Sequence, residues 1–219
     1  MTQDTSSEPA PPAKRGRGRP KAASDSDRRS SILETARRTF VELGLIGTTT
    51  DIVASRCKIS KQTLYRLFPS KTDLFIAVVA AHRQMMLDLP RPTDEDAPLA
   101  DVIASIFMID IDADMERERS AFIHIIMREA HQLPDMAEIL FREGPQTSQR
   151  QLAEWLAGQV ERGRLQLEDP MNGARMLMDL LFSGPGPLRW KDLGERRRHM
   201  EQAIGIFVRG TQKPPHKPG

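Results

Sequence analysis

Five hydrogen-bonding side chains gather between positions 61 and 66, at the spacing of one short helix: Lys61, Gln62, Thr63, Tyr65 and Arg66. All five can donate hydrogen bonds, and two of them are cationic. Amide and guanidinium groups of this kind pair with base edges in the major groove of DNA, while cations and hydroxyls pair with phosphates. The segment is therefore a candidate nucleic-acid contact surface.

Two short helices, over residues 50–56 and 60–67, are expected to hold this surface. Each carries an apolar pair at helical spacing, Val53 and Cys57 on the first and Leu64 and Leu67 on the second. Such pairs can meet in a small apolar seam. Ser60 can accept hydrogen bonds from the free N–H groups where the second helix begins. The pattern predicts a helix-turn-helix, and the alternative is a helical hairpin that happens to be polar outside.

Further cations flank the predicted helix-turn-helix. Lys71 opens the next predicted helix, where a cation beside free N–H groups can hold a phosphate. Upstream, residues 14–21 are basic and rich in Gly and Pro, and Arg17 and Arg19 stand on either side of Gly18. Arginines on such a narrow, extended chain can enter an A·T-rich minor groove. The alternative for this segment is a solvated tail.

The charge of the chain is unevenly distributed. Over all 219 residues the net charge is only +2, but residues 1–75 carry 14 Lys and Arg against 8 Asp and Glu, a net charge of +6. The remainder is acidic, with a net charge of −4. A basic front on an acidic body indicates that one end meets a polyanion.

Composition also excludes several classes of protein. A single cysteine excludes an internal disulfide. The apolar runs fall well short of the roughly 20 residues that cross a bilayer, and no secretory signal is present. We expect a soluble, cytoplasmic protein that has no membrane partner and no cofactor.

Apolar residues recur every three or four positions along most of the chain, and no hairpin signal occurs. This predicts an all-α fold of nine or ten helices. The long helix from about residue 71 to 89 is expected to connect two domains. The expected organisation is a disordered basic arm (1–27), a helix-turn-helix domain (28–75), a helical ligand-binding and dimerisation domain (76–211) and a flexible tail (212–219).

The stretch from Ile32 to Leu74 resembles the DNA-binding domain of TetR-family transcriptional regulators. The similarity is carried by Ser60, by Thr63-Leu64-Tyr65 and Phe68, and by Ser70-Lys71 followed by Leu74. Residues 133–145 and 162–170 are similar to the AefR-like subgroup of the family's C-terminal domains. The Arg-Gly-Arg-Pro segment at 17–20 also resembles the core of an AT-hook.

The resemblance implies a function and a role for particular residues. It implies a homodimeric repressor that binds double-stranded operator DNA and is released by an unknown small-molecule effector. Phosphate contacts are implied for Thr49 or Thr50, Tyr65 and Lys71. Base contacts are implied for Lys61, Gln62 and Thr63, and Arg66 suits either role.

Lys58 departs from the family pattern, which has glycine in this turn. A lysine in the left-handed conformation costs on the order of 1 kcal/mol. Either the turn is altered, or Lys58 is retained because it adds a phosphate contact.

The C-terminal part offers a candidate pocket and a candidate dimer surface. Large or soft side chains are expected to line the pocket: Phe107, Met108, Phe122, His124, Met127, Phe141 and Trp155. An apolar stripe on the last two helices is expected to form the dimer interface: Leu177, Leu181, Met200, Ile204, Phe207 and Val208. An ordinary helical core is the alternative for both sets, and the stripe can close the core, pair with a second subunit, or do both.

Other functions find less support in the sequence. Asp110, Asp112 and Asp114 lack the glycine and glutamate of a calcium loop and suit the start of a helix instead. No acid, base or nucleophile set converges, which disfavours a small helical enzyme. A ligand-independent architectural DNA-binding protein remains the alternative to a ligand-released repressor.

Overall fold

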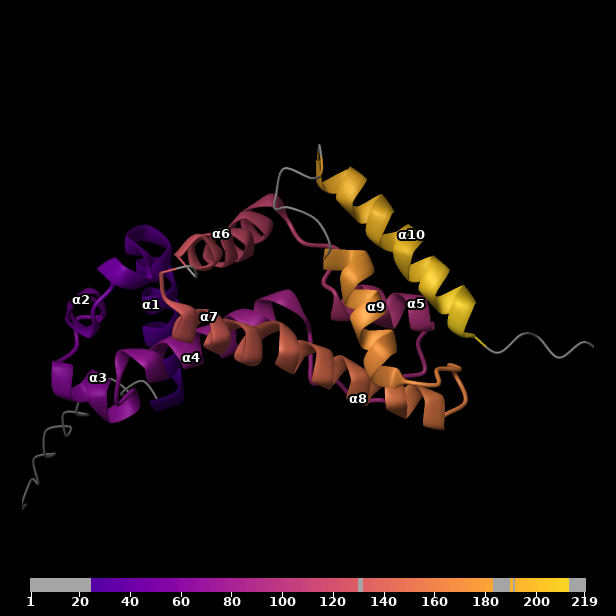
Figure 1. Ribbon diagram of the computed structural model, residues 1–219, viewed down its shortest axis with the longest axis horizontal. Helices are drawn as coiled ribbons and strands as arrows, with labels where there is room; N and C mark the ends of the chain where they lie inside the picture. Colours follow the sequence, from indigo (N-terminus) through magenta and orange to yellow (C-terminus); the bar gives the residue numbers. More distant parts are fainter. Residues whose placement is uncertain (1–24, 130–131, 183–189, 191, 213–219) are drawn as a thin grey trace, which may run out of the picture.

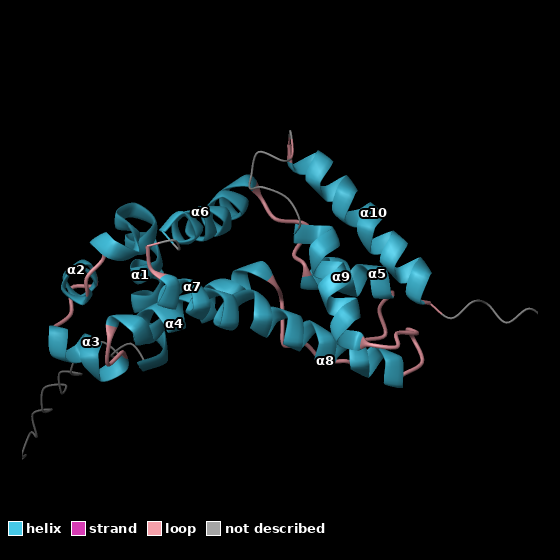
Figure 2. Cartoon of the chain, in the orientation of Figure 1, coloured by secondary structure: helices cyan, strands magenta, loops and turns pink. Residues whose placement is uncertain are grey.

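The computed structural model describes residues 25–129, 132–182, 190 and 192–212, and within these ranges every regular element is a helix (Figures 1 and 2). The predicted all-α fold is confirmed. The helices are α1 (Asp25–Gly47), α2 (Thr50–Arg56), α3 (Lys61–Leu67), α4 (Lys71–Met86), α5 (Leu99–Ile106), α6 (Ala113–Glu129), α7 (Pro134–Phe141), α8 (Thr147–Glu161), α9 (Pro170–Phe182) and α10 (Leu193–Thr211).

Local hydroxyl caps set the starts of α2, α3 and α4. Thr49, Ser60 and Ser70 each accept a hydrogen bond from the backbone N–H three residues ahead, at 3.2, 3.1 and 3.0 Å. Each cap satisfies one of the N–H groups that a helix start leaves open. The cap expected at Ser60 is therefore present, and it fixes where α3 begins.

Helix α1 begins earlier than the sequence indicated, because its first turns pack on the end of α3. Asp25 pairs with Arg66 at 3.3 Å, and the Arg29 guanidinium lies 4.4 Å above the Phe68 ring and donates to the Leu67 carbonyl. Residues 25–27, assigned to the disordered arm, are therefore helical. Arg17, Arg19 and the tail after residue 212 lie outside the described residues.

Helices α7 and α8 are joined without a break (Figure 1). The chain continues from one to the other through a π-helical turn, η1 (Arg142–Gln146), with Pro145 inside it. Proline lacks the N–H that a regular turn needs, and a widened turn tolerates that loss. Pro134 and Pro170, by contrast, stand at the first positions of α7 and α9, where a missing N–H is harmless.

The apolar side chains form two core clusters. The first joins α1–α4 to the second half of α6 and to Leu140 of α7, with Phe40 and Phe75 edge to face at 5.6 Å. The second joins α5, α8, α9 and α10 to the segment after α4. Because Phe122 and Ile126 of α6 complete the first cluster, the DNA-facing helices share their core with α6. The expected domain boundary near residue 75 stays a prediction.

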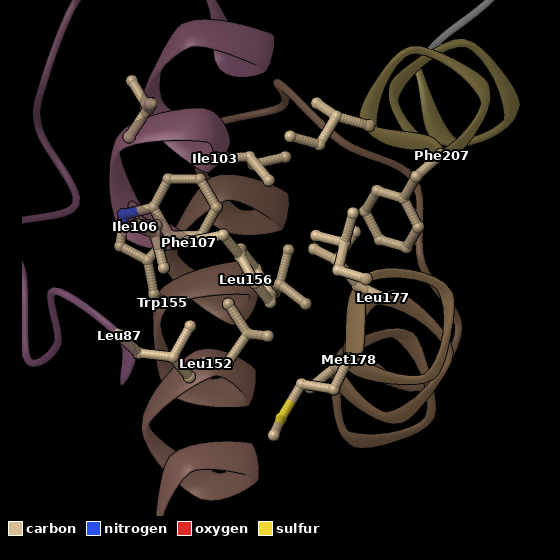
Figure 3. Packing of buried hydrophobic residues seen from close by; sticks show 14 of the residues in the cluster. Leu87, Ile103, Ile106, Phe107, Leu152, Trp155, Leu156, Leu177, Met178 and Phe207 are labelled. Atoms are coloured by element: carbon tan, nitrogen blue, oxygen red, sulfur yellow. The ribbon is translucent and has the colours of Figure 1, made fainter. Parts of the chain in front are cut away.

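The stripe assigned to a dimer interface lies inside the second cluster. Leu177, Leu181, Met200, Ile204, Phe207 and Val208 are all buried within the single chain. Figure 3 shows Phe207 of α10 directed at Leu177 of α9, beside Leu156 of α8. This burial favours the alternative that the stripe closes the core, because apolar periodicity reveals which face of a helix is buried but not what covers it.

Helix α6 is fastened to α1 at two points. Near its start, Glu118 binds the Arg37 guanidinium through its carboxylate at 3.0 Å and its carbonyl at 3.3 Å. At its end, the Glu129 carboxylate accepts hydrogen bonds from the amides of Leu45 at 2.6 Å and Ile46 at 3.4 Å. Gly44 makes the second contact possible, because its φ of +73° turns those amides toward Glu129.

Replacing Gly44 with alanine should lower the free energy of unfolding by about 2–4 kcal/mol. A Cβ atom there would carry left-handed strain and would stand 2.1 Å from Oε1 of Glu129. Gly47→Ala is the control, because its Cβ would meet nothing nearer than 3.4 Å. The control should change stability by less than about 1 kcal/mol in urea denaturation. Equal losses in the two variants would contradict the role given to Gly44.

Candidate nucleic-acid interface and ligand cavity

Helix α3 presents a polar face to solvent and an apolar face to the protein. Lys61, Gln62, Tyr65 and Arg66 are exposed and lie on one side of the helix, while Leu64 is fully buried on the other. Within the described residues, the Gln62 side chain makes no hydrogen bond. An exposed helix with free donors on its outer face has the form of a helix that reads a major groove.

The remaining polar groups of this face are held by contacts to neighbouring helices. Tyr65 Oη and Thr50 Oγ1 lie 2.9 Å apart, which joins α3 to the start of α2. Lys61 pairs with Asp51 at 2.6 Å, and this hydrogen bond raises the pKa of Lys61. Exposed ion pairs of this kind contribute little stability, so a phosphate can replace the carboxylate. Thr63 is half-buried, and its backbone N–H is bound by Ser60.

The turn between α2 and α3 keeps the left-handed conformation despite its lysine. Lys58 has a φ of +53°, and its side chain is exposed. The turn is therefore not rebuilt to avoid the strain. Of the two alternatives for Lys58, this geometry favours a lysine that bears the strain and leaves its ammonium available for a contact. The neighbouring Cys57 is half-buried, and burial raises the pKa of its thiol, as suits a packing residue.

The Lys71 ammonium is partly buried and contacts the protein. Its Nζ donates to the carbonyl of Leu45, and burial lowers the pKa of the ammonium while nearby Glu129 opposes that shift. Lys71 thus satisfies a carbonyl at the end of α1, next to the amides that Glu129 binds. This contact uses one of the three ammonium donors, so the phosphate contact expected of Lys71 stays a prediction.

A cavity of about 1180 Å³ lies among α4, α6, the α7–α8 connection, α9 and the start of α10. Three of the expected pocket residues line it: His124, Met127 and Phe141. The other four do not. Phe107 and Trp155 fill the second core cluster, Phe122 fills the first, and Met108 lies in a left-handed turn beside a separate surface pocket.

Two buried arginines that sequence reasoning missed also line the cavity. Arg119 and Arg196 are only 3% and 5% exposed, and both contact Oε2 of Glu116, at 2.9 and 3.5 Å. A signal was present in the sequence. Arg119 stands three positions before Phe122, on the buried face of α6, and Arg196 stands four before Met200, on that of α10. A charge inside an apolar stripe marks a paired or functional group.

The acidic segment before α6 acts as a helix start. Asp112 Oδ1 accepts a hydrogen bond from the Met115 amide at 2.8 Å. This contact agrees with a helix start, the role that the sequence offered in place of a calcium loop. Among the described residues, no group of three potential ligands is placed to hold a metal ion.

Replacing Lys58 with glycine should raise the free energy of unfolding by about 0.5–1 kcal/mol, because glycine adopts positive φ without strain. Ser55→Gly, at an exposed position within α2, is the matched control and should lower it by roughly 0.5 kcal/mol. Urea denaturation of both variants at equal protein concentration measures the two effects. A Lys58→Gly protein that is less stable than wild type would show that the turn carries no strain.

Family models match most of the chain with known regulators. Residues 32–78 match the model of bacterial regulatory proteins of the tetR family. Residues 111–209 match that of the AefR-like transcriptional repressor C-terminal domain. No helix among the described residues has the length and hydropathy needed to span a membrane.

Individual relatives agree with these models. An uncharacterized HTH-type transcriptional regulator of Bacillus subtilis, YvkB, is 25% identical over 82% of this chain and 94% of its own length. The Flavonoid-responsive Regulator FrrA has a similar structure, with a TM-score of 0.58 at 24% identity over 88% of this chain and all of that one. A TetR-family structure from Rhodococcus sp. has a TM-score of 0.66 at 18% identity, covering 84% and 99%. The chain belongs to the TetR family of DNA-binding transcriptional regulators and carries an AefR-like C-terminal domain.

Proposed function

We propose that the protein represses transcription by binding operator DNA through α3, and that a small molecule in the large cavity lowers its DNA affinity. The exposed polar face of α3 carries the DNA-binding part of this proposal. Gln62 is assigned the main base contact, since its amide can pair with an adenine and makes no hydrogen bond to any residue that the structure describes. Lys61, Thr63 and Arg66 are assigned supporting contacts along the groove.

Phosphate contacts are assigned to groups on either side of α3. Thr49, Thr50 and Tyr65 place three hydroxyls at the junction of α2 and α3, and Lys58 adds a cation at the turn. Lys71 gives one donor to the Leu45 carbonyl, and its remaining donors are assigned to a phosphate. Arg17 and Arg19 are proposed to follow the adjacent minor groove, on the strength of the sequence alone.

The position of α6 supports the proposal that a ligand releases the protein from its operator DNA. This helix lines the cavity with Glu116, Arg119, His124 and Met127, and it holds α1 at Arg37 and at the amides after Gly44. A ligand that moves α6 therefore shifts the DNA-binding helices, in proportion to its differential affinity for the two states. In this proposal α6 transmits ligand binding to the DNA-binding helices, together with α4. FrrA is described as flavonoid-responsive, and the related repressor SmeT is described in a complex with triclosan.

A homodimer is proposed through the outer faces of α9 and α10, in place of the buried stripe. Met176, Leu180 and Ile206 are exposed apolar residues on these two helices. A contact of His199 with the Leu180 carbonyl at 3.2 Å holds the two helices together. Pairing this surface with its copy would bury apolar area that a monomer leaves in water.

An enzymatic role is not proposed. An architectural DNA-binding protein without a ligand is the second candidate, and the cavity with its buried charges is the observation that disfavours it. Release of the protein from its preferred DNA by a small molecule separates the two.

Replacing Gln62 with alanine should cost about 1–3 kcal/mol of binding free energy on the preferred site and relax the preference at one base pair in each half-site. Binding to random DNA should be almost unchanged, because Gln62 carries no charge. Gln166→Ala, at an exposed position between α8 and α9, is the control and should leave both affinities as in wild type. Equal losses on specific and random DNA would show that Gln62 does not read a base.

Replacing Ile206 with aspartate should give a folded monomer, because Ile206 is 53% exposed on the proposed interface. The same change at the adjacent Phe207, 5% exposed, should unfold the protein, because it places a charge in the core. Light scattering and circular dichroism at micromolar concentration distinguish these results. A folded Ile206→Asp dimer would refute the proposed interface.

A further inference from the structure

The buried charges of the large cavity do not balance. Two guanidiniums, those of Arg119 and Arg196, share the single carboxylate oxygen Oε2 of Glu116. The other oxygen of Glu116 accepts from Ser120 at 3.3 Å. Asp179 and Asp192 also line the cavity, but both are exposed, and Asp192 is occupied in capping α10. The buried part of the wall therefore carries an excess of positive charge.

Several polar groups of this wall have no hydrogen-bond partner among the described residues. They include Nη1 of Arg119 and Nε of Arg83. Burial, together with the nearby charges of Arg37 and Arg119, lowers the pKa of His82 to about 4. The ring is therefore neutral at physiological pH and presents one N–H donor. Leaving buried donors unpaired costs free energy, so a ligand that accepts from them is favoured.

Many of the other lining residues are apolar. Val79, Met86, Ile123, Leu140, Phe141 and Phe182 are among the residues that supply it. The cavity volume of about 1180 Å³ accommodates a molecule of drug size. A ligand that fits this cavity therefore needs an apolar body in addition to a negative group.

We infer that the effector is an amphipathic organic acid, whose carboxylate binds Arg119 beside His82 and whose apolar body fills the cavity among α4, α6 and α8. This inference rests on the proposed function and names the chemical class of the ligand. The carboxylate would accept from Nη1 of Arg119, which Glu116 does not bind, and would offset the positive charge that one Glu116 carboxylate shared by two guanidiniums leaves in the wall. Because Arg119 belongs to α6, the charged end of the ligand engages the helix that holds α1.

Calorimetric titration with three probes of equal chain length, decanoate, decan-1-ol and decylammonium, tests the inference on the full-length protein. Wild type should bind decanoate at least about tenfold more tightly than decan-1-ol, and decylammonium least. Arg119→Met should reduce decanoate affinity about tenfold and leave decan-1-ol affinity within twofold. Arg119→Lys should retain most of the preference for decanoate.

Two further variants make the test specific. Arg128→Met removes an exposed cation of α6 that does not line the cavity, and its decanoate affinity should match wild type. Glu116→Gln removes the carboxylate that competes with the ligand, and it should bind decanoate more tightly than wild type. Decanoate should therefore raise the melting temperature of Glu116→Gln by more than it raises that of wild type.

Equal affinities for decanoate and decan-1-ol, or no binding of any probe, would overturn the inference. An unchanged preference for decanoate in Arg119→Met would also overturn it. These results are independent of DNA binding, which is measured separately on random-sequence DNA. A protein that prefers decanoate but shows no preferred DNA site would contradict the proposed function and leave the ligand class standing.

Discussion

The position of the DNA-binding helices against α6 depends on the carboxylate of Glu129. This carboxylate binds the two amides that follow Gly44, next to the carbonyl that Lys71 binds, so α1, α4 and α6 meet within a few ångströms. The same helix, α6, supplies both Phe122 to the core of the DNA-binding helices and Arg119 to the cavity. Removing this contact would leave the DNA-binding helices fastened to α6 only through Arg37 and apolar packing.

Much of the fold followed from local patterns. Apolar spacing and hydroxyl caps located α2, α3 and α4 to within a few residues, because those signals act within one helical turn. Contacts distant in sequence could not be read in this way. The early start of α1 depends on Arg66 and Phe68, and the unbroken join of α7 to α8 depends on a π-helical turn that accommodates Pro145.

The site residues divide in the same way, into those that local patterns revealed and those whose surroundings depend on distant parts of the chain. Residues of α3 were predicted because one short helix displays them all, and the structure exposes Gln62, Tyr65 and Arg66 together. Pocket and interface residues were chosen by size and periodicity, which do not say which helix covers them. Phe107, Trp155 and Phe207 proved to be core for that reason. Arg119 was visible in principle, as a charge on an apolar face.

Binding selection from random DNA, run with wild type and with Glu129→Ala, tests most directly whether Glu129 sets the position of the DNA-binding helices. Wild type should recover a palindrome whose half-sites lie at one spacing, with centres about 34–36 Å apart or a multiple of that distance. Glu129→Ala should recover the same half-site sequence over a broader range of spacings. Asymmetric sites from wild type, or an equally sharp spacing from Glu129→Ala, would contradict this account.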